Sequence, residues 1–185
     1  MNNTKLVFRA LMLAILCVSA FIKIPIPYIP FTLQFLVVII LGQVFGAKSG
    51  GLIVLLYILL GLIGIPVFTS GGGIGYIFQP TFGYLLGFFF ACVIIGIFVK
   101  YIHIKFYRVI ANVLGMCAMY VCGSTYMYFL SKLYLHQEIS IEYILVYGIL
   151  VQIPGDLLLS FIGAYLSKRI IKLIGRYRRN GETSL

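Results

Sequence analysis

Long runs of apolar residues fill most of this 185-residue chain, and short stretches containing lysine, arginine, proline or glycine separate them. A membrane core ~30 Å thick is crossed by about 20 residues of α-helix, so each run predicts a spanning helix. Strict alternation of apolar and polar residues, the mark of an outer-membrane barrel, is absent from the sequence. The predicted spans are residues 6–22, 31–46, 50–65, 83–99, 109–130 and 144–174, the last with a break near residues 154–155. The pattern therefore predicts an all-α integral membrane protein, a six-transmembrane-helix bundle forming one transmembrane domain over residues 1–185.

The amino-acid composition agrees with this prediction. Hydrophobic residues make up 62% of the chain and charged residues only 10%, which is far from the composition of a soluble domain. Because the predicted spans use up most of the residues, the sequence leaves no room for a separate soluble domain.

Positive charges are distributed unevenly between the two ends of the predicted bundle. Lysine and arginine next to spans are retained on the cytoplasmic side, so the end with more of them is expected to face the cytoplasm. That end carries Lys5, Arg9, Lys48, Lys100, Lys105, Arg108, Lys168, Arg169, Lys172, Arg176, Arg178 and Arg179, whereas the other carries Lys23 and Lys132. Both termini are therefore expected to be cytoplasmic, in a multi-pass protein of the cytoplasmic (inner) membrane. This asymmetry and attraction to membrane lipid account for the net charge of +10, and no nucleic-acid binding is expected.

Neither a cleaved signal peptide nor a metal centre is expected. Lys5 and Arg9 precede an apolar run, as they would in a signal peptide, but we expect this run to remain as the first span. The four cysteines fall inside predicted spans at unrelated spacings, which is typical of small packing residues. His103 and His136 fall in opposite loops without a second ligand nearby.

Two unusual connections are expected at the outer end of the bundle. Residues 24–31, IPIPYIPF, carry three of the six prolines, which predicts a stiff, extended segment. Residues 67–82, VFTSGGGIGYIFQPTF, are long and rich in glycine, which favours a lid whose main chain can approach a ligand closely. A flexible linker is the alternative for this second connection.

Asp156 lies within the last apolar stretch, where an ionised carboxylate costs at least ~2.5–3.5 kcal/mol. Pro154 removes a backbone donor and Gly155 loosens the turn, so the helix is expected to be interrupted beside the carboxylate. Interrupted helices at membrane depth commonly carry substrate contacts in transport proteins. The alternatives are a protonated Asp156 in a helix contact, or one hydrogen-bonded to residues 124–126 of the fifth span.

A small, mostly apolar pocket open to the outside is expected around Asp156. Polar residues predicted at the outer halves of spans would line it: Gln34, Gln79, Thr81, Tyr84, Tyr126 and Gln152. No second carboxylate, membrane histidine or serine–base pair accompanies Asp156 in the sequence, so an enzyme is not expected. The chain also lacks a nucleotide-binding motif, and we expect neither a cofactor nor a metal.

Four motifs in order along the chain resemble those of one family. They are AFIKIPIPYIPFTLQ at residues 20–34, LLGLIGIPVF at 59–68, QPTFGYLLGF at 79–88 and IPGDLL at 153–158. The chain resembles the BioY family over residues 6–172. Members of that family are the biotin-binding substrate components, or S components, of energy-coupling-factor (ECF) transporters. The resemblance implies a six-helix bundle with cytoplasmic termini that captures biotin from outside, between the two unusual connections and helices four to six.

The resemblance also implies roles for particular residues. Asp156 matches the family aspartate that contacts the ligand, and a carboxylate can accept a hydrogen bond from a ureido N–H of biotin. Gln79 is the candidate second partner, whereas Thr81 and Tyr84 match weaker motif positions. We also expect Gln34, in the second span, to contribute to substrate binding.

The chain departs from the family pattern at two positions. Leu159 stands where many members have a lysine, so the sequence does not identify the group that holds the ligand carboxylate. Lys23, the backbone N–H groups of Gly71 to Gly73, with Gly72 and Gly73 as the candidates, or solvent could serve. Phe82 replaces the usual glycine after Pro-Thr and is expected to add bulk at the pocket mouth.

The resemblance implies protein partners as well. Family members associate with a transmembrane transducer and two ATPase subunits. They contact the transducer through an A-x-x-x-A pattern on the first helix, matched here by Ala10 and Ala14. Two small residues one turn apart allow another helix to approach, although packing within the protein is an equally common use. Solitary action without these partners, an S component for another vitamin, and a non-transporting membrane scaffold remain as alternatives.

Overall fold

The computed structural model describes residues 3–26, 29–104, 106–134 and 140–182. Lys105 and His136, which the sequence analysis named, lie outside the described residues. The helices are α1 (Asn3–Ser19), α2 (Gln34–Ile40), α3 (Gly46–Leu62), α4 (Phe82–Tyr101), α5 (Tyr107–Leu133), α6 (Ile141–Leu145) and α7 (Ile153–Glu182). Between them lie the strands β1 (Lys23–Ile24) and β2 (Phe31–Thr32), the π-helical turns η1 (Leu41–Phe45) and η3 (Val146–Leu150), and the 3₁₀ turn η2 (Ile74–Phe78).

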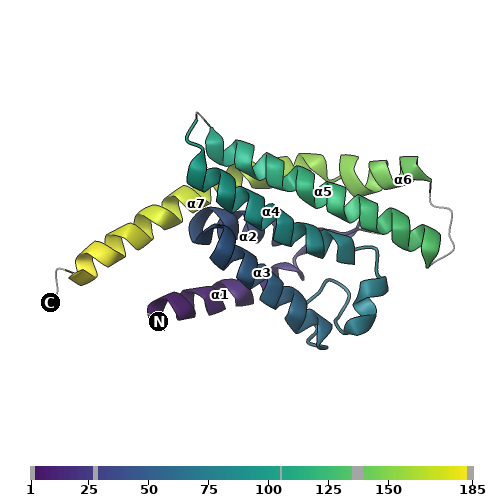
Figure 1. Cartoon of the computed structure of the whole chain (residues 1–185), viewed down its shortest axis with the longest axis horizontal. Coiled ribbons are helices and arrows are strands. Elements are labelled where there is room, and N and C mark those ends of the chain that lie inside the picture. The colour runs from purple at the N-terminus through teal and green to yellow at the C-terminus, as the bar shows by residue number, and fades with distance from the viewer. Residues whose placement is uncertain (1–2, 27–28, 105, 135–139, 183–185) are drawn as a thin grey trace.

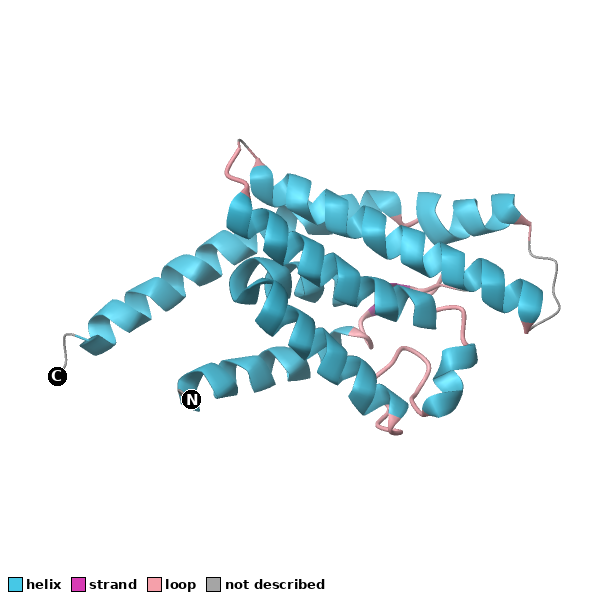
Figure 2. Ribbon diagram, in the orientation of Figure 1, coloured by secondary structure: helices cyan, strands magenta, loops and turns pink. Residues whose placement is uncertain are grey.

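Four helical segments are long and apolar enough to cross a membrane. They are Gln34–Leu62, Phe82–Tyr101, Tyr107–Leu133 and Ile141–Gly175, and a shorter apolar helix covers Leu6–Ser19. In Figures 1 and 2 the helices α4 and α5 run side by side, with α3 beside α4 and α6 beside α5. The prediction of a helical membrane protein is therefore confirmed at the level of four candidate spans.

Two spans predicted separately fall within the helical segment Gln34–Leu62, and the chain changes direction inside it at Gly46. Gly46 has a φ of 74°, in the left-handed region that favours glycine. A Cβ atom added to Gly50 would lie 2.7 Å from the carbonyl oxygen of Leu41, so the residues before and after Gly46 pack against each other. Backbone freedom at one glycine thus turns this segment back on itself.

The proline-rich connection forms a small antiparallel hairpin. Lys23 pairs with Thr32 and Ile24 with Phe31, and the amide of Leu33 donates to the carbonyl of Ile22 at 3.2 Å. The hairpin joins the end of α1 to the start of α2, and it carries Phe31 and Thr32 to the centre of the molecule.

The glycine-rich connection is anchored to α3. Phe68 is fully buried and lies against the bare backbone of Gly61, where an added Cβ would come within 1.9 Å of its ring. Tyr57 meets Phe68 edge-on with ring centroids 5.4 Å apart, and the amide of Gly73 donates to the carbonyl of Gly61 at 2.7 Å. These contacts favour a docked cover over a flexible linker.

The last apolar stretch is interrupted just before the prolyl residue. The π-helical turn η3 ends at Leu150, a turn occupies residues 151–152, and α7 begins at Ile153. Pro154 thus lies in the first turn of α7, where a missing backbone donor costs little. The interruption therefore lies a few residues before the position that the sequence suggested, and Asp156 lies in the first turn of the new helix.

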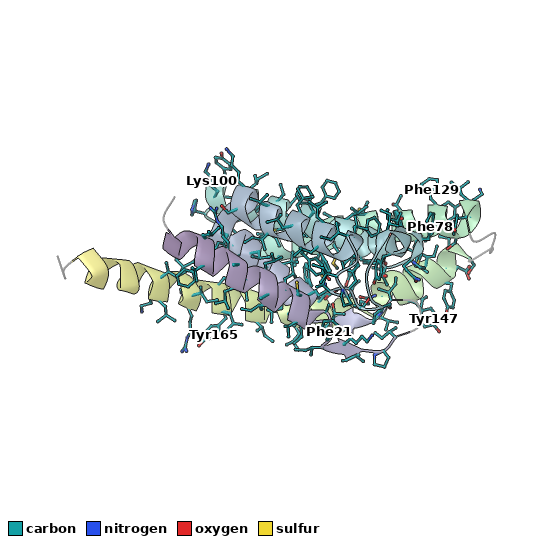
Figure 3. All side chains as sticks on the ribbon, turned by 90° about the horizontal axis from the view of Figure 1, so that it is seen from below. Phe21, Phe78, Lys100, Phe129, Tyr147 and Tyr165 are labelled. Atoms are coloured by element: carbon teal, nitrogen blue, oxygen red, sulfur yellow. The ribbon has the colours of Figure 1, made fainter. Side chains whose placement is uncertain are left out.

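Both termini lie at one end of the molecule. Figure 1 shows the N-terminus of α1 and the C-terminus of α7 at the left, with the two helices diverging from each other. Lys100 is at the same end in Figure 3, whereas Phe78, Phe129 and Tyr147 are at the opposite end.

Candidate functional site

A cavity opens between the hairpin, the glycine-rich segment and helices α4, α5 and α7. Its empty space is about 460 Å³, counting its open mouth. The lining residues come from five parts of the chain: Ile29, Pro30, Phe31, Thr32, Gln34, Phe35, Thr69, Tyr76, Thr81, Tyr84, Leu85, Phe88, Met119, Gln152 and Asp156. Apolar walls therefore surround a few polar groups, as in binding sites for small organic molecules.

Asp156 is the acidic residue of this lining. Its side chain is 2% exposed, and its Oδ2 accepts a hydrogen bond of 2.5 Å from the hydroxyl of Tyr120 on α5. Within the described part of the chain, Oδ1 accepts no hydrogen bond. The carboxylate thus keeps acceptor capacity next to the cavity.

The fifth span does supply a partner to Asp156, but not from residues 124–126. The hydroxyl of Ser124 donates to the carbonyl of Tyr120, and the hydroxyl of Tyr126 donates to the carbonyl of Ile77. Thr125 is exposed. The Asp156 partner, Tyr120, is a residue that the sequence analysis did not select.

Tyr84 and Gln152 line the cavity, and their polar groups contact the main chain nearby. The hydroxyl of Tyr84 donates to the carbonyl of Gly148 at 3.0 Å, which holds η3 against α4. The amide of Gln152 makes only long contacts, 3.4 Å to the carbonyl of Ile29 and 3.5 Å to that of Tyr147. Tyr84 therefore presents ring surface, and Gln152 a weakly engaged donor.

Hydrogen bonds tie the glycine-rich segment to the cavity wall. The hydroxyl of Tyr76 lies between those of Thr69, at 2.9 Å, and Thr81, at 3.0 Å. On the other side, the Nε2 of Gln34 donates to the hydroxyl of Tyr57 at 2.7 Å, and Tyr57 donates to the carbonyl of Val67 at 3.0 Å. The polar side chains of the wall also hold the cover in place.

Five of the residues singled out in the sequence lie outside the lining, among them Tyr126, which was predicted to belong to it. Gln79 is exposed, the amide of Gly73 bonds to Gly61, and an added Cβ on Gly72 would lie 2.3 Å from the carbonyl oxygen of Ile65. The Nζ of Lys23 donates to the carbonyl of Thr69 at 2.7 Å. Because Thr69 lines the cavity, this exposed ammonium group lies at its rim.

The two departures from the family pattern are both buried outside the lining. Leu159 is 5% exposed and belongs to the apolar core. Phe82 is 7% exposed and packs edge-on against Tyr126, with ring centroids 5.7 Å apart. Among the residues that line the cavity, none is cationic.

Tyr120 and Tyr76 are the polar contributors that the sequence analysis missed. A buried tyrosine hydroxyl usually has a hydrogen-bond partner, which is the one general signal for such residues. The chain has 14 tyrosines, however, so this signal does not single out two of them.

A second candidate surface lies on α1. Ala10 and Ala14 are both exposed, and so are the larger residues next to them, Val7 at 65% and Leu11 at 54%. Leu16, in contrast, is fully buried. The small residues thus face outward from the bundle.

Comparison with known proteins places this arrangement in a family. A family model described as the BioY family matches residues 1–176. The chain belongs to the BioY family. A probable biotin transporter BioY from Lysinibacillus sphaericus is 38% identical over 174 residues, which cover 93% of this chain and 89% of the relative. The biotin transporter BioY from Thermotoga maritima is 31% identical, with 91% and 96% of the two chains covered.

A solved structure of an S component for biotin has the same fold. The crystal structure of the S component for biotin from an ECF-type ABC transporter superimposes with a TM-score of 0.81 and 29% sequence identity. The match covers 93% of this chain and 94% of the other. BioY proteins are transporter components and not enzymes, in agreement with the expectation from the sequence.

Proposed function

We propose that this chain captures biotin at the outer side of the membrane and delivers it inward as the substrate-binding component of an ECF transporter. The observation that carries the proposal is a buried carboxylate, Asp156, facing a mostly apolar cavity in a chain of the BioY family. The named relatives and the S-component structure support the same ligand.

The chemistry of the cavity suits the two poles of biotin. The ureido ring offers two N–H donors and one carbonyl acceptor, and Oδ1 of Asp156 is placed to accept one of the donors. Gln152, with its two long contacts, is available to donate to the ureido carbonyl, whereas Thr81 already donates its hydroxyl proton to Tyr76. The apolar side chains of Phe31, Phe88 and their neighbours would enclose the sulfur ring and aliphatic chain.

The valerate carboxylate is assigned to the rim of the cavity. Lys23 presents an ammonium group there, next to Thr69. Gln79 and Gly72 lie on the same glycine-rich segment and would contribute at the mouth, whereas the amide of Gly73 already donates to the carbonyl of Gly61. Gln34 lies in the cavity wall and donates to Tyr57, which in turn donates to the carbonyl of Val67 at the start of the glycine-rich segment.

Six spans with both termini in the cytoplasm are part of the proposal. The reversal at Gly46 divides the segment Gln34–Leu62 into two helices, and the apolar α1 adds one more span. Lys100 and both termini share one end of the molecule, which supports a cytoplasmic placement of that end. A single domain over residues 1–185 in the cytoplasmic membrane follows from this topology.

The partners we propose are a transmembrane transducer and two ATPases. The exposed Ala10 and Ala14 form a flat stripe on α1 that a transducer helix could approach closely. Action without these partners is the alternative, and adjacent genes for a transducer and ATPases would argue against it.

Equilibrium dialysis of labelled biotin against the purified chain in detergent tests the ligand and the role of Asp156. We expect nanomolar-class binding, and a loss of about 10- to 150-fold in Asp156→Asn, since a hydrogen bond to a charged group contributes ~1.5–3 kcal/mol. Glu142→Gln is the matched control, because it makes the same change at an exposed position on α6. Thiamine and riboflavin serve as competitors.

The bond between Tyr120 and Asp156 supports one rival, a membrane scaffold in which Asp156 only joins α5 to α7. In that case the chain would not retain biotin, or Asp156→Asn and Glu142→Gln would bind it equally well. Effective competition by thiamine or riboflavin would instead point to another vitamin.

A further inference from the structure

A second concave surface lies at the end of the molecule that carries the termini. It lies between η1, the start of α3 and the end of α4, and its empty space is about 1390 Å³ counting its open side, compared with 460 Å³ for the first cavity. Figure 1 shows α3 and α4 side by side, and Figure 3 places Lys100 at this end. We call this surface the α3–α4 groove.

Glycine residues form the floor of the α3–α4 groove. An added Cβ on Gly96 would lie 2.2 Å from the amide nitrogen of Ala47, and one on Gly51 would lie 3.1 Å from a methyl group of Val93. The two helices therefore meet backbone to backbone at Gly96 and backbone to side chain at Gly51. Apolar side chains flank this floor: Leu52, Phe89, Val93 and Ile97.

The flanking side chains face outward from the bundle. Leu52 and Ile97 are each 48% exposed, so in a membrane they lie against lipid chains. The groove thus offers a long apolar trough on the lipid-facing side of the protein.

Two lysines line the same groove, and both are exposed. Lys100 bonds to the hydroxyl of the neighbouring Tyr101 at 3.2 Å, with its Nζ 4.8 Å from the centre of that ring. Neither Lys48 nor Lys100 forms an ion pair with a described residue, and no carboxylate is among the lining residues. The charge at this end of the groove is therefore positive and uncompensated.

We infer that the α3–α4 groove binds one anionic phospholipid, whose phosphate contacts Lys48 and Lys100 and whose acyl chain lies along Leu52, Phe89, Val93 and Ile97. Basic pockets between spanning helices are suited to anionic headgroups. A free phosphate would use the two lysines but not the trough. A protein helix is less well matched. Its apolar face would fill the trough, but it would bring no counter-charge to the two ammonium groups at one end of the groove. This inference does not depend on the ligand of the first cavity.

Native mass spectrometry of the full chain with added lipids tests the inference. The lipids are phosphatidylglycerol and phosphatidylcholine with the same long chains, dihexanoyl phosphatidylglycerol, and glycerol 3-phosphate as the free anion. We expect one retained long-chain phosphatidylglycerol, and weaker retention of the other three by at least about fivefold. The K48Q/K100Q double variant should lose this preference.

The matched control is the K168Q/K172Q double variant. It removes two exposed lysines on α7, outside the groove. It should keep the preference for phosphatidylglycerol if the groove is the site. Equal losses in both double variants would overturn the inference in favour of general attraction to this end of the molecule.

Two further results would also overturn it. Binding of glycerol 3-phosphate as tight as that of the long-chain lipid would show a free-anion site. Unchanged lipid retention in K48Q/K100Q, together with retained biotin binding as a check of folding, would show that these lysines hold no lipid.

Discussion

Lys23 offers a test of how the proposed site recognises the charged end of its ligand. The Nζ of Lys23 lies at the cavity rim and donates to the carbonyl of Thr69 at 2.7 Å. In Lys23→Met the apolar stem and its length are kept, while the charge and this hydrogen bond are lost. If Lys23 holds the valerate carboxylate, the substitution weakens biotin binding but leaves the neutral biotin amide nearly unaffected.

The exposure of Lys23 decides the size of this effect. A buried ion pair could contribute several kcal/mol, but this ammonium group is exposed and must share or give up its bond to Thr69. Exposed pairs contribute ~0.2–1 kcal/mol, which corresponds to about 1.4- to 5-fold in Kd. We therefore expect Lys23→Met to weaken biotin binding by a few-fold, far less than Asp156→Asn.

Isothermal titration of both ligands against both proteins gives the four Kd values. Salt supplies a second readout, because the screening length falls from ~30 Å at 0.01 M to ~3 Å at 1 M, so the preference of the unsubstituted protein for biotin over its amide should shrink. Lys132→Met, at an exposed lysine near the end of α5, is the matched control and should change neither ligand. If Lys23→Met weakened the binding of biotin and of its amide equally, the reasoning would be refuted. Lys23 would then only join the hairpin to the glycine-rich segment through its bond to Thr69.

Two other predictions concern stability and assembly. Tyr120→Phe removes the donor to Asp156, so we expect the free energy of unfolding to fall by ~1–3 kcal/mol. Because the chain has no tryptophan, unfolding can be followed with a thiol-reactive dye that reports exposure of the buried Cys92. An unchanged melting curve would contradict this prediction. Ala14→Leu adds a large side chain to the outward face of α1, so it should reduce co-purification with a transducer while biotin binding persists. The control is Cys117→Leu, on an exposed face of α5. Equal co-purification of both variants would count against the stripe of Ala10 and Ala14 as the contact surface.

Hydropathy predicts most of the helices here because spanning length is a simple physical requirement. It does not predict where the chain bends inside an apolar run. The turn at Gly46 and the π-helical turns at residues 41–45 and 146–150 depend on how neighbouring helices pack. An apolar run does not predict this packing. The interruption before α7 shows the same limit, since Pro154 marks the region but fits the first turn of a helix better than a break.

The site could be predicted where a polar residue conflicts with its surroundings. Asp156, Gln34 and Tyr84 stand out in apolar sequence, and all three line one cavity. Gln79 lies in a polar loop where no such conflict exists, and the structure leaves it exposed. Tyr120 is 36 residues from Asp156 in sequence, so only the packing of α5 against α7 reveals the pair.

The hydrogen bond from Tyr120 leaves the buried carboxylate of Asp156 able to accept a further bond from the neutral ureido ring of the proposed ligand. A lysine beside it would form an ion pair and satisfy the acceptors that a ligand needs, so binding would have to break that pair. A tyrosine hydroxyl donates one hydrogen bond only, to Oδ2, and the other oxygen keeps its capacity. Because the nearby Leu159 is packed in the apolar core and Lys23 lies outside at the rim, the two anionic groups of the complex, Asp156 and the ligand carboxylate, are assigned to opposite ends of the cavity. In the proposed site this separation would keep like charges apart, and the hydrogen bonds of the ureido ring would then be the main source of selectivity.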